Sequence, residues 1–289
     1  MPQRRKYWSQ TMRLDVKKTY KLFIGGAFPR SESGRSYQIK NKRGVFIANP
    51  AQASRKDLRD AVLAAKGALA GWASATAFNR GQILYRIAEM LEGRTSQFVD
   101  EIVETTGVTT ASAKQEVSEA IDLWVWYAGW CDKINSVSGA NNSIAGPYYN
   151  FTSPEPLGVI GVVAEERESL IGLVRSLAPV IAGGNTAVLI ASESRPLGAV
   201  TFAEVLATSD LPAGVVNILT GFKSELAPWL ASHMEVDGLD LTGISGSIAE
   251  LKKSGAESLK RIHAFEIEVS PNRILAFMEF KTLWHPVGI

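Results

Sequence analysis

Three carboxylates are concentrated in one short turn of this sequence. The stretch GVIGVVAEERESLIGL (158–173) opens as a strand-like run of small and β-branched residues and closes as an apolar helical pattern. Between the two parts lie Glu165, Glu166, Arg167 and Glu168. A strand-to-helix turn is where α/β proteins usually bind a ligand, which makes this turn a candidate active-site cluster. The alternative is a solvated helix start, where acidic side chains are favoured.

A second candidate is the loop TGISGS (242–247), which follows a predicted strand and opens a helix. Backbone N–H groups at such a helix start could hold an anion. The phosphate fingerprint G-x-G-x-x-G is absent, and position 247 is serine, so the loop also misses the G-x-S-x-G elbow of serine hydrolases. Glu193, near the end of another predicted strand, could accept hydrogen bonds from ribose hydroxyls or stabilise the first turn of the next helix.

Neither cysteine nor histidine forms a reactive cluster in the sequence. Cys131 is the single cysteine, which excludes an internal disulfide and a cysteine-rich zinc site. It falls on the apolar stripe of a predicted helix, so we expect an inert core thiol rather than a nucleophile. The histidines at 233, 263 and 285 are widely scattered, and we expect no metal site.

The composition is that of a globular protein. The 289 residues are 46% hydrophobic, and 31 basic residues balance 29 acidic ones, which gives no electrostatic case for nucleic acid or an anionic membrane as partner. No apolar run approaches the roughly 18 residues of a membrane helix, and the start lacks the apolar core of a secretory signal. We therefore expect a cytoplasmic protein with a frayed basic tail at residues 1–20.

The order of predicted elements indicates the fold class. Helices are predicted from about residues 54, 79 and 111, the first one opened by a capping box at Ser54. After Gly146, five short strand patterns alternate with helical runs, at 158–164, 186–192, 215–221, 238–243 and 260–267. Such alternation predicts an α/β fold, a Rossmann-like, doubly wound parallel sheet. The strand-like tail 273–289 follows the fifth strand closely and could pair at the sheet edge.

Several segments resemble the aldehyde dehydrogenase superfamily, in that family's order. They are KLFIGGAFPRSESGRSY, NRGQILYRIAEMLEGR, PLGVIGVV, LAPVIAGGNTAVL, LPAGVVNILTG, VDGLDLTG and LKRI, and they span residues 21 to 272. The opening RLDVKKTYKLFIGGAFPRSESGRSY is most similar to the noncatalytic second half of the family-16 enzymes. The resemblance implies a cofactor-binding fold with N-terminal helices (21–142), oligomerisation strands (143–157), a Rossmann-like part (158–272) and a C-terminal oligomerisation strand (273–289).

The resemblance weakens at the family's functional positions. The asparagine that holds the oxyanion falls on Arg167, and the general-base glutamate falls on Phe265. The cofactor lysine falls on Ile190, and two positions of the phosphate turn have become Ile244 and Ile248. The cofactor contacts that the resemblance still implies are Ser192, Glu193, Gly221, Thr242 and Gly243.

These departures predict a pseudoenzyme from which the catalytic domain is missing, with no catalytic residue and no bound cofactor. We expect it to associate with a complete aldehyde dehydrogenase subunit through Phe277, Phe280, Leu283 and Trp284 of the C-terminal strand, or to form a homodimer through its cofactor-domain helices. The alternatives are an NAD(H)-binding module or an NAD-dependent aldehyde oxidoreductase with unfamiliar residues. With the catalytic domain absent, the acidic turn is expected to be solvated.

Overall fold

A parallel five-stranded sheet forms the centre of the protein. The computed structural model describes residues 16–288, so most of the predicted basic tail lies outside the described residues. The strand order is β7-β6-β5-β8-β9, and every neighbouring pair is parallel. The strands are β5 (Val159–Val163), β6 (Thr186–Ile190), β7 (Val216–Leu219), β8 (Gly238–Asp240) and β9 (Arg261–His263). The predicted doubly wound sheet is confirmed, although the last two strands are shorter than expected.

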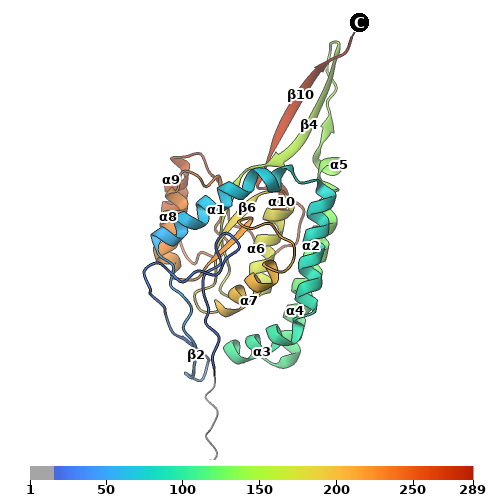
Figure 1. Cartoon of the computed structure of the whole chain (residues 1–289). Helices are drawn as coiled ribbons and strands as arrows, with labels where there is room; N and C mark the ends of the chain where they lie inside the picture. Colours follow the sequence, from blue (N-terminus) through green and yellow to red (C-terminus); the bar gives the residue numbers. More distant parts are fainter. Residues whose placement is uncertain (1–15, 289) are drawn as a thin grey trace, which may run out of the picture.

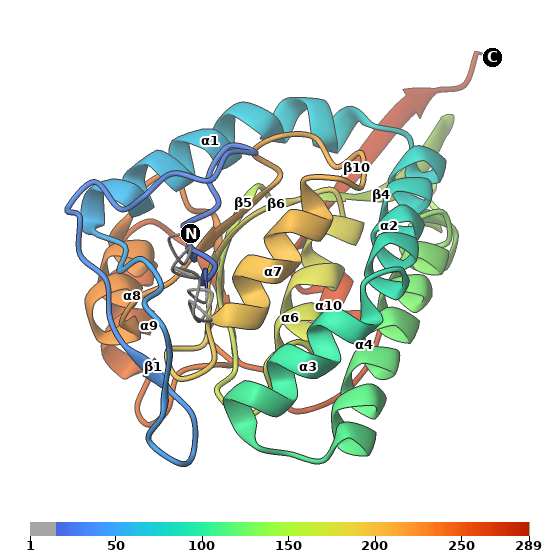
Figure 2. The ribbon, with the colours of Figure 1, turned by 60° about the horizontal axis from the view of Figure 1, so that its bottom comes forward.

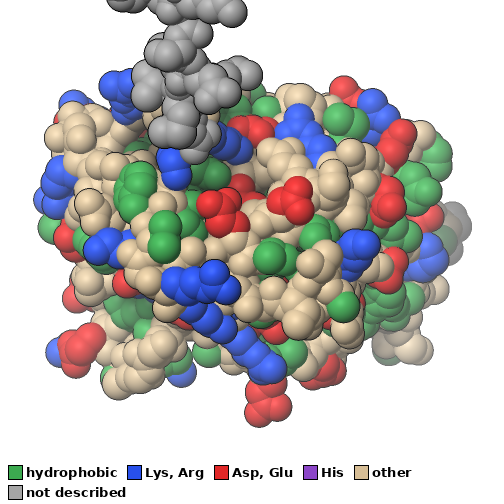
Figure 3. All heavy atoms as spheres, turned by 90° about the horizontal axis from the view of Figure 1, so that it is seen from below, with side chains coloured by type: hydrophobic (Ala, Val, Ile, Leu, Met, Phe, Trp, Pro, Cys, Tyr) green, Lys and Arg blue, Asp and Glu red, His purple; other side chains and the backbone are tan. Residues whose placement is uncertain are grey.

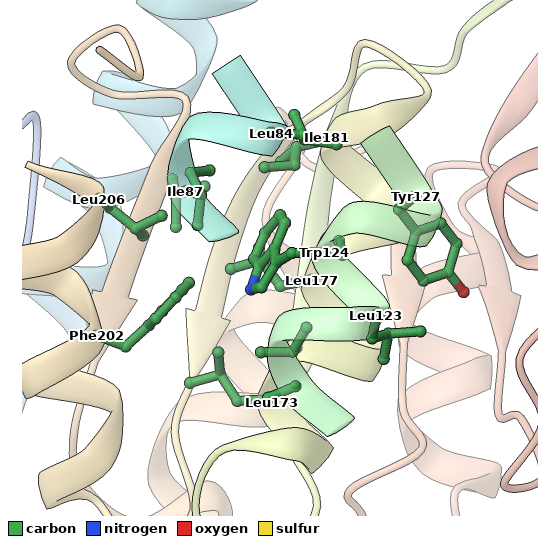
Figure 4. Close-up of a cluster of buried hydrophobic side chains, with 14 of the residues drawn as sticks. Leu84, Ile87, Leu123, Trp124, Tyr127, Leu173, Leu177, Ile181, Phe202 and Leu206 are labelled. Atoms are coloured by element: carbon green, nitrogen blue, oxygen red, sulfur yellow. The ribbon is translucent and has the colours of Figure 1, made fainter. Parts of the chain in front are cut away.

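Helices cover both faces of this sheet (Figures 1 and 2). On one face, α6 (Ile171–Ala182) and α7 (Leu197–Leu206) pack on the strands, and α2 (Ala77–Glu92), α3 (Thr95–Thr106) and α4 (Thr110–Trp130) pack on these two helices. Its core is built from large side chains such as Trp124 and Phe202, whose rings stack with centroids 5.7 Å apart (Figure 4). The strands are buried on both faces, which is why they read as continuous β-branched runs instead of alternating.

The opposite face packs against α1 (Arg55–Ser74), α8 (Lys223–Ser232) and α9 (Ala249–Ala256). The predicted capping box of α1 is confirmed. The Ser54 hydroxyl accepts hydrogen bonds from the N–H groups of Lys56 and Asp57, and the Asp57 carboxylate accepts from the Ser54 N–H. Ahead of α1, the short strands β1 (Ile39–Lys40) and β2 (Phe46–Ala48) form a separate antiparallel pair.

A three-stranded antiparallel arm projects from one end of the body (Figure 1). It contains β3 (Ala140–Asn141), β4 (Tyr148–Pro156) and β10 (Met278–Pro286), with the order β10-β4-β3. The two short helices α5 (Ile134–Ser138) and α10 (Asn272–Leu275) lead into it. The alternative that the tail pairs at the edge of the central sheet is wrong, because β10 pairs with β4 along its whole length.

Phe277 differs from Phe280, Leu283 and Trp284, the other three residues predicted to contact a partner subunit. It is only 1% exposed and belongs to the hydrophobic core, because it lies between α10 and β10, where its ring packs against Gly238 and His263. Phe280, Leu283 and Trp284, which follow it on β10, are exposed. Phe277 is therefore a core residue, and the predicted contact residues that a partner could reach all lie on β10.

Among residues 16–288, no helix is long and apolar enough to cross a membrane.

Candidate functional site

The candidate site lies at the carboxyl end of the central sheet, at the opposite end of the body from the arm. Figure 3 looks onto this face, which carries acidic, basic and hydrophobic side chains. A cavity of about 360 Å³ opens there between the loop after β5, the start of α8 and the loop after β8. Its lining residues are Glu166, Glu193, Lys223, Ser224, Ala227, Pro228, Gly243, Ile244, Ser245 and Leu251.

The acidic turn 165–168 is not a solvated surface, and that prediction is wrong. Glu165 is buried, and its carboxylate lies 3.1 Å from a guanidinium nitrogen of Arg175 on α6. Glu168 is half-buried and contacts the same nitrogen, also at 3.1 Å. Of the four residues, only Arg167 is exposed. The turn is acidic because a buried arginine needs carboxylate partners, since an unpaired buried charge is very costly.

The backbone N–H groups just before α6 are hydrogen-bonded by a residue outside the acidic turn. The N–H groups of Ser169 and Leu170 donate to one carboxylate oxygen of Glu116, on α4, at 2.9 and 2.8 Å. These are N–H groups that the helix itself leaves without partners. The acidic turn lies just before α6, as predicted, but these two N–H groups are bonded by Glu116 rather than by the turn.

Glu166 forms the centre of the site. Its carboxylate contacts the Lys223 ammonium at 2.5 Å and accepts hydrogen bonds from the Ser192 hydroxyl at 2.6 Å and the Glu193 N–H at 2.9 Å. Lys223 is buried and also donates to the backbone oxygens of Ala164, at 2.5 Å, and Gly243, at 2.9 Å. The ion pair thus ties together the ends of β5 and β6, the loop after β8 and the start of α8.

The pKa of Glu166 reflects this bonding. Partial burial opposes ionisation, but hydrogen bonds from Lys223, Ser192 and the Glu193 N–H outweigh it and lower the pKa to about 2. Glu166 is therefore a fixed anion at physiological pH. A carboxylate with so low a pKa cannot serve as a general acid or base near neutrality.

Two predicted cofactor contacts, Ser192 and Glu193, have structural partners. The Ser192 hydroxyl donates to Glu166 and accepts from the Arg195 N–H at 3.0 Å. The Glu193 carboxylate accepts a hydrogen bond from the backbone N–H of Lys223, the first residue of α8. Glu193 also lines the cavity, whereas Ser192 does not.

The other three predicted contacts, Gly221, Thr242 and Gly243, shape the backbone. Thr242 donates through its N–H and hydroxyl to Asp240, and its hydroxyl accepts from the Phe265 N–H at 2.9 Å. A side chain at Gly243 would collide with the carbonyl of Ala164, so only glycine lets the two loops meet. Gly221 has a φ of +146°, and a Cβ there would lie 3.2 Å from the Ala53 nitrogen. Of the five contacts, only Glu193 and Gly243 line the cavity.

A second buried ion pair lies behind the site. Asp240 at the end of β8 is 3.3 Å from a guanidinium nitrogen of Arg273, and both side chains are almost fully buried. Burial raises the pKa of Asp240, against the opposing effect of Arg273. The guanidinium also lies over the Phe265 ring, 4.5 Å from its centroid. These charges hold the Phe265 segment against the sheet.

Sequence reasoning missed Lys223, Arg175 and Arg273. One signal was present for Lys223. A lysine in the first turn of a helix opposes the helix dipole, so it requires a specific anionic partner. No local signal identified the two arginines, because each finds its carboxylate partner only through the tertiary fold.

The remaining reactive candidates are inert or dispersed. Cys131 is buried at the end of α4, as predicted, and burial raises the pKa of its thiol to about 11. Phe265 stacks on the His263 ring and makes an edge contact with the Phe277 ring. Within residues 16–288, no three histidine, cysteine, aspartate or glutamate side chains are grouped to hold a metal ion.

Comparison with known proteins identifies the framework that carries this site. The model of the aldehyde dehydrogenase family matches residues 28–272. The chain belongs to the aldehyde dehydrogenase family. Cytosolic 10-formyltetrahydrofolate dehydrogenase of Xenopus tropicalis is 34% identical over 248 residues, which make up 84% of this chain and 28% of that protein. Retinal dehydrogenase 2 of Gallus gallus is 32% identical and is covered over 52% of its length, against 93% of this chain.

Solved structures of the aldehyde dehydrogenase family share the fold. HpcC from Thermus thermophilus superimposes with a TM-score of 0.80 at 27% identity, over 85% of this chain and 47% of that one. The NAD+ complex of an aldehyde dehydrogenase from Bacillus cereus gives a TM-score of 0.79 at 25% identity, over 85% and 50% of the two chains. The chain therefore spans about a quarter to a half of the length of the relatives that it matches.

Proposed function

We propose that this chain is a catalytically inactive member of the aldehyde dehydrogenase family that acts as a structural or regulatory partner of a complete aldehyde dehydrogenase subunit. The ion pair between Glu166 and Lys223 is the observation that carries this proposal. It occupies the carboxyl end of the sheet with a salt bridge of the protein's own, which ties Ala164 to Gly243. Ligands of parallel α/β sheets bind at this end.

The side chains around the site lack the groups for covalent acyl transfer. That chemistry needs an activated nucleophile, a base to accept its proton and a donor for the oxyanion. By the family resemblance, the positions of the base and of the oxyanion donor carry Phe265 and Arg167. Phe265 cannot accept a proton, and Arg167 is exposed with its carbonyl engaged by Arg195. Cys131 is a buried thiol whose high pKa keeps it protonated.

The same site disfavours a dinucleotide. Glu166 is a permanent anion at the cavity wall, and a phosphate placed beside it would meet like charge in a partly buried setting. Glu193 already caps the start of α8, and Ile244 presents an apolar side chain. A second candidate function, an NAD(H)-binding module, is favoured only by the 360 Å³ cavity beside Glu193.

The arm supplies the surface for association. The side chains of Phe280, Leu283 and Trp284 are 51%, 46% and 60% exposed, on a strand with one unpaired edge among the described residues. Adding a strand to such an edge is an efficient way for proteins to recognise one another. In this proposal β10 docks on a complete aldehyde dehydrogenase subunit.

Cofactor binding and turnover can be tested directly on the purified chain. We expect calorimetric titration with NAD+ to give no binding heat, and an assay with NAD+ and propanal to give no NADH. A complete aldehyde dehydrogenase treated in parallel is the positive control for both measurements. NAD+ binding without turnover would establish the second candidate instead, and turnover that depends on Glu166 or Lys223 would refute the inactive assignment.

Association is tested by co-expression with a complete aldehyde dehydrogenase from the same genome, followed by size-exclusion chromatography. We expect the two chains to elute together, and the variant Trp284→Ser to elute separately. The matched control is Trp229→Ser, which removes an exposed tryptophan from α8, on the alternative helical interface. Loss of co-elution in Trp229→Ser, with retention in Trp284→Ser, would move the interface from the arm to the helices. Separate elution of the unmodified chains would refute the partnership.

A further inference from the structure

Among the described residues, β10 has a long edge that no strand pairs with. Among residues 16–288, β10 pairs on one side with β4, and no strand lies on its other side. Every residue of β10 after Met278 is exposed. An edge of this length with aromatic side chains on it associates with other strands unless something covers it. The edge therefore needs an occupant, and the residues along it indicate which one.

Two hydrogen bonds at the ends of the arm show which backbone groups face outward. Leu157 donates to the Phe277 carbonyl at 3.1 Å, and Val287 donates to the Pro147 carbonyl at 2.8 Å. Odd-numbered residues of β10 therefore point their backbone groups at β4, because the direction alternates along an antiparallel strand. The even-numbered positions then point outward. Pro154 fits this pattern, since it lies opposite Phe280 and has no N–H to donate.

We propose that this edge pairs with the β10 edge of a second copy of the same chain, antiparallel and with Thr282 opposite Thr282. In that register the outward N–H and C=O groups of Phe280, Thr282 and Trp284 all find partners on the other copy. The result is one continuous sheet with the order β3-β4-β10-β10-β4-β3. Such a sheet is also more stable than a ribbon of few strands standing alone in water.

Side chains select this register over its neighbours. With Thr282 at the twofold axis, Phe280 lies opposite Trp284 of the other copy, and Glu279 lies opposite His285. Lys281 lies opposite Leu283, so no like charges meet. Cross-strand aromatic pairs of this kind stabilise antiparallel sheets, and directly opposed like charges destabilise them.

The neighbouring registers are less favourable. Centring the pair on Lys281 would place two lysines face to face, which is unfavourable. Centring it on Leu283 would place Phe280 opposite Pro286 instead of Trp284, so the aromatic pair of the proposed register would be lost. In a register shifted by an odd number of residues, each even-numbered residue would lie opposite an odd-numbered residue of the other copy. The backbone N–H and C=O groups of that odd-numbered residue already bond to β4, so the outward groups would find no partner.

The shape of the molecule permits this pairing. The arm extends well beyond the helices that cover the central sheet, and its tip points away from them (Figure 1). In an antiparallel pair centred on Thr282, the two bodies lie at opposite ends of the joined arms. This association needs no complete aldehyde dehydrogenase, and a complete subunit that docks on β10 would compete with the second copy for the same edge.

The first experiment measures the mass of the purified chain alone by light scattering across a concentration series. We expect a dimer of twice 31.3 kDa that dissociates on dilution. Thr282→Pro removes one outward N–H and leaves the backbone hydrogen bonds to β4 in place, although it also removes the 2.9 Å hydroxyl contact with Thr152, so this variant is expected to be a folded monomer. A monomeric unmodified chain would overturn the proposal, and so would a dimer unaffected by Thr282→Pro.

Two substitutions at one position test the register. Leu283→Glu places a carboxylate opposite Lys281 of the other copy, whereas Leu283→Lys places a second ammonium there. Both remove the same leucine, so a merely hydrophobic association would weaken equally in the two variants. We expect the dimer dissociation constants to differ by roughly tenfold, with Leu283→Glu the tighter. Equal dissociation constants would overturn the register.

A disulfide provides a direct measurement of the twofold axis. Residues that exchange hydrogen bonds in an antiparallel pair have Cα atoms about 5.5 Å apart, which is within reach of a disulfide. Thr282→Cys should therefore form a covalent dimer under mild oxidation, and Leu283→Cys should form much less. Cys131 is buried and does not compete. Equal cross-linking at the two positions would contradict the proposed symmetry.

Discussion

The polar groups at the two ends of this protein differ in whether they have partners within the protein. At the carboxyl end of the central sheet, charged side chains are paired with one another inside the protein, as in the contacts of Glu165 with Arg175 and of Glu166 with Lys223. On the arm, aromatic side chains and a backbone edge are exposed to solvent. At the end that binds ligands in α/β proteins the charged side chains have partners within the protein, whereas at the opposite end the edge of β10 has none among the described residues.

This difference indicates where the molecule can bind. A charge that already has a buried partner gains little from a ligand, because the ligand would have to replace that partner. An unpaired strand edge has no contact within the protein to break on binding, and it exchanges hydrogen bonds with water for backbone hydrogen bonds to the partner. The comparison therefore favours macromolecular association at the arm over small-molecule chemistry at the sheet, and it can be tested residue by residue.

The largest expected effect separates two phenylalanines that lie three positions apart. Phe277→Ala should lower the free energy of unfolding by about 3–5 kcal/mol, because it empties a fully buried site. Phe280→Ala should change it by less than about 0.5 kcal/mol, since that ring is half exposed on the arm. Urea unfolding at submicromolar protein concentration measures both without a contribution from association. Similar losses in the two variants would mean that the arm is packed as tightly as the body.

Arg175→Met should have the next largest effect. It leaves the buried Glu165 and the half-buried Glu168 without their shared cation, and breaking a buried pair costs about 3 kcal/mol or more. Urea unfolding near pH 7 measures the loss. Glu165→Gln combined with Arg175→Met should recover part of it, because the orphaned charge is then removed. A single variant as stable as the unmodified chain would show that the acidic turn is solvated after all.

The ion pair at Glu166 should give a pH-dependent effect of about 2 kcal/mol. The folded-state pKa of Glu166 is lowered from 4.5 to about 2, so its contribution to stability is complete above pH 4.5 and is lost as the pH falls towards 2. The magnitude is reduced by partial solvent exposure. Unfolding of the unmodified chain and of Glu166→Gln should differ most near neutral pH and converge in acid. A difference independent of pH would assign the effect to packing.

The smallest effect is expected on the arm. Lys281 and Glu155 form an exposed ion pair at 2.9 Å, and such pairs contribute between 0 and about 1 kcal/mol. Lys281→Met should therefore change the free energy of unfolding by less than about 0.5 kcal/mol in monomeric protein. The same measurement on Arg175→Met provides the contrast between an exposed and a buried pair. A loss above about 2 kcal/mol would show that the arm shares the electrostatic character of the site.

Much of the fold could be predicted from the sequence. Strands such as VIGVV (159–163) and TAVLI (186–190) are buried on both faces, which leaves a continuous β-branched pattern that local reasoning can read. The capping box at Ser54 depends on residues three positions apart and was likewise readable. The helix α3 was not predicted separately, because it starts without a side-chain cap and follows α2 after two residues.

The site was less predictable than the fold. The residue types of the acidic turn were visible, but their role depends on Arg175 and Lys223, which only the folded chain brings to them. The tail 273–289 was recognisably strand-like, whereas its pairing with β4 joins segments about 130 residues apart. The sequence by itself determined the α/β class, the strand and helix order and the family, because these rest on periodicity and local motifs. Only the tertiary structure decided which charges are paired and which edge is free, because electrostatic and backbone pairing depend on distance in space.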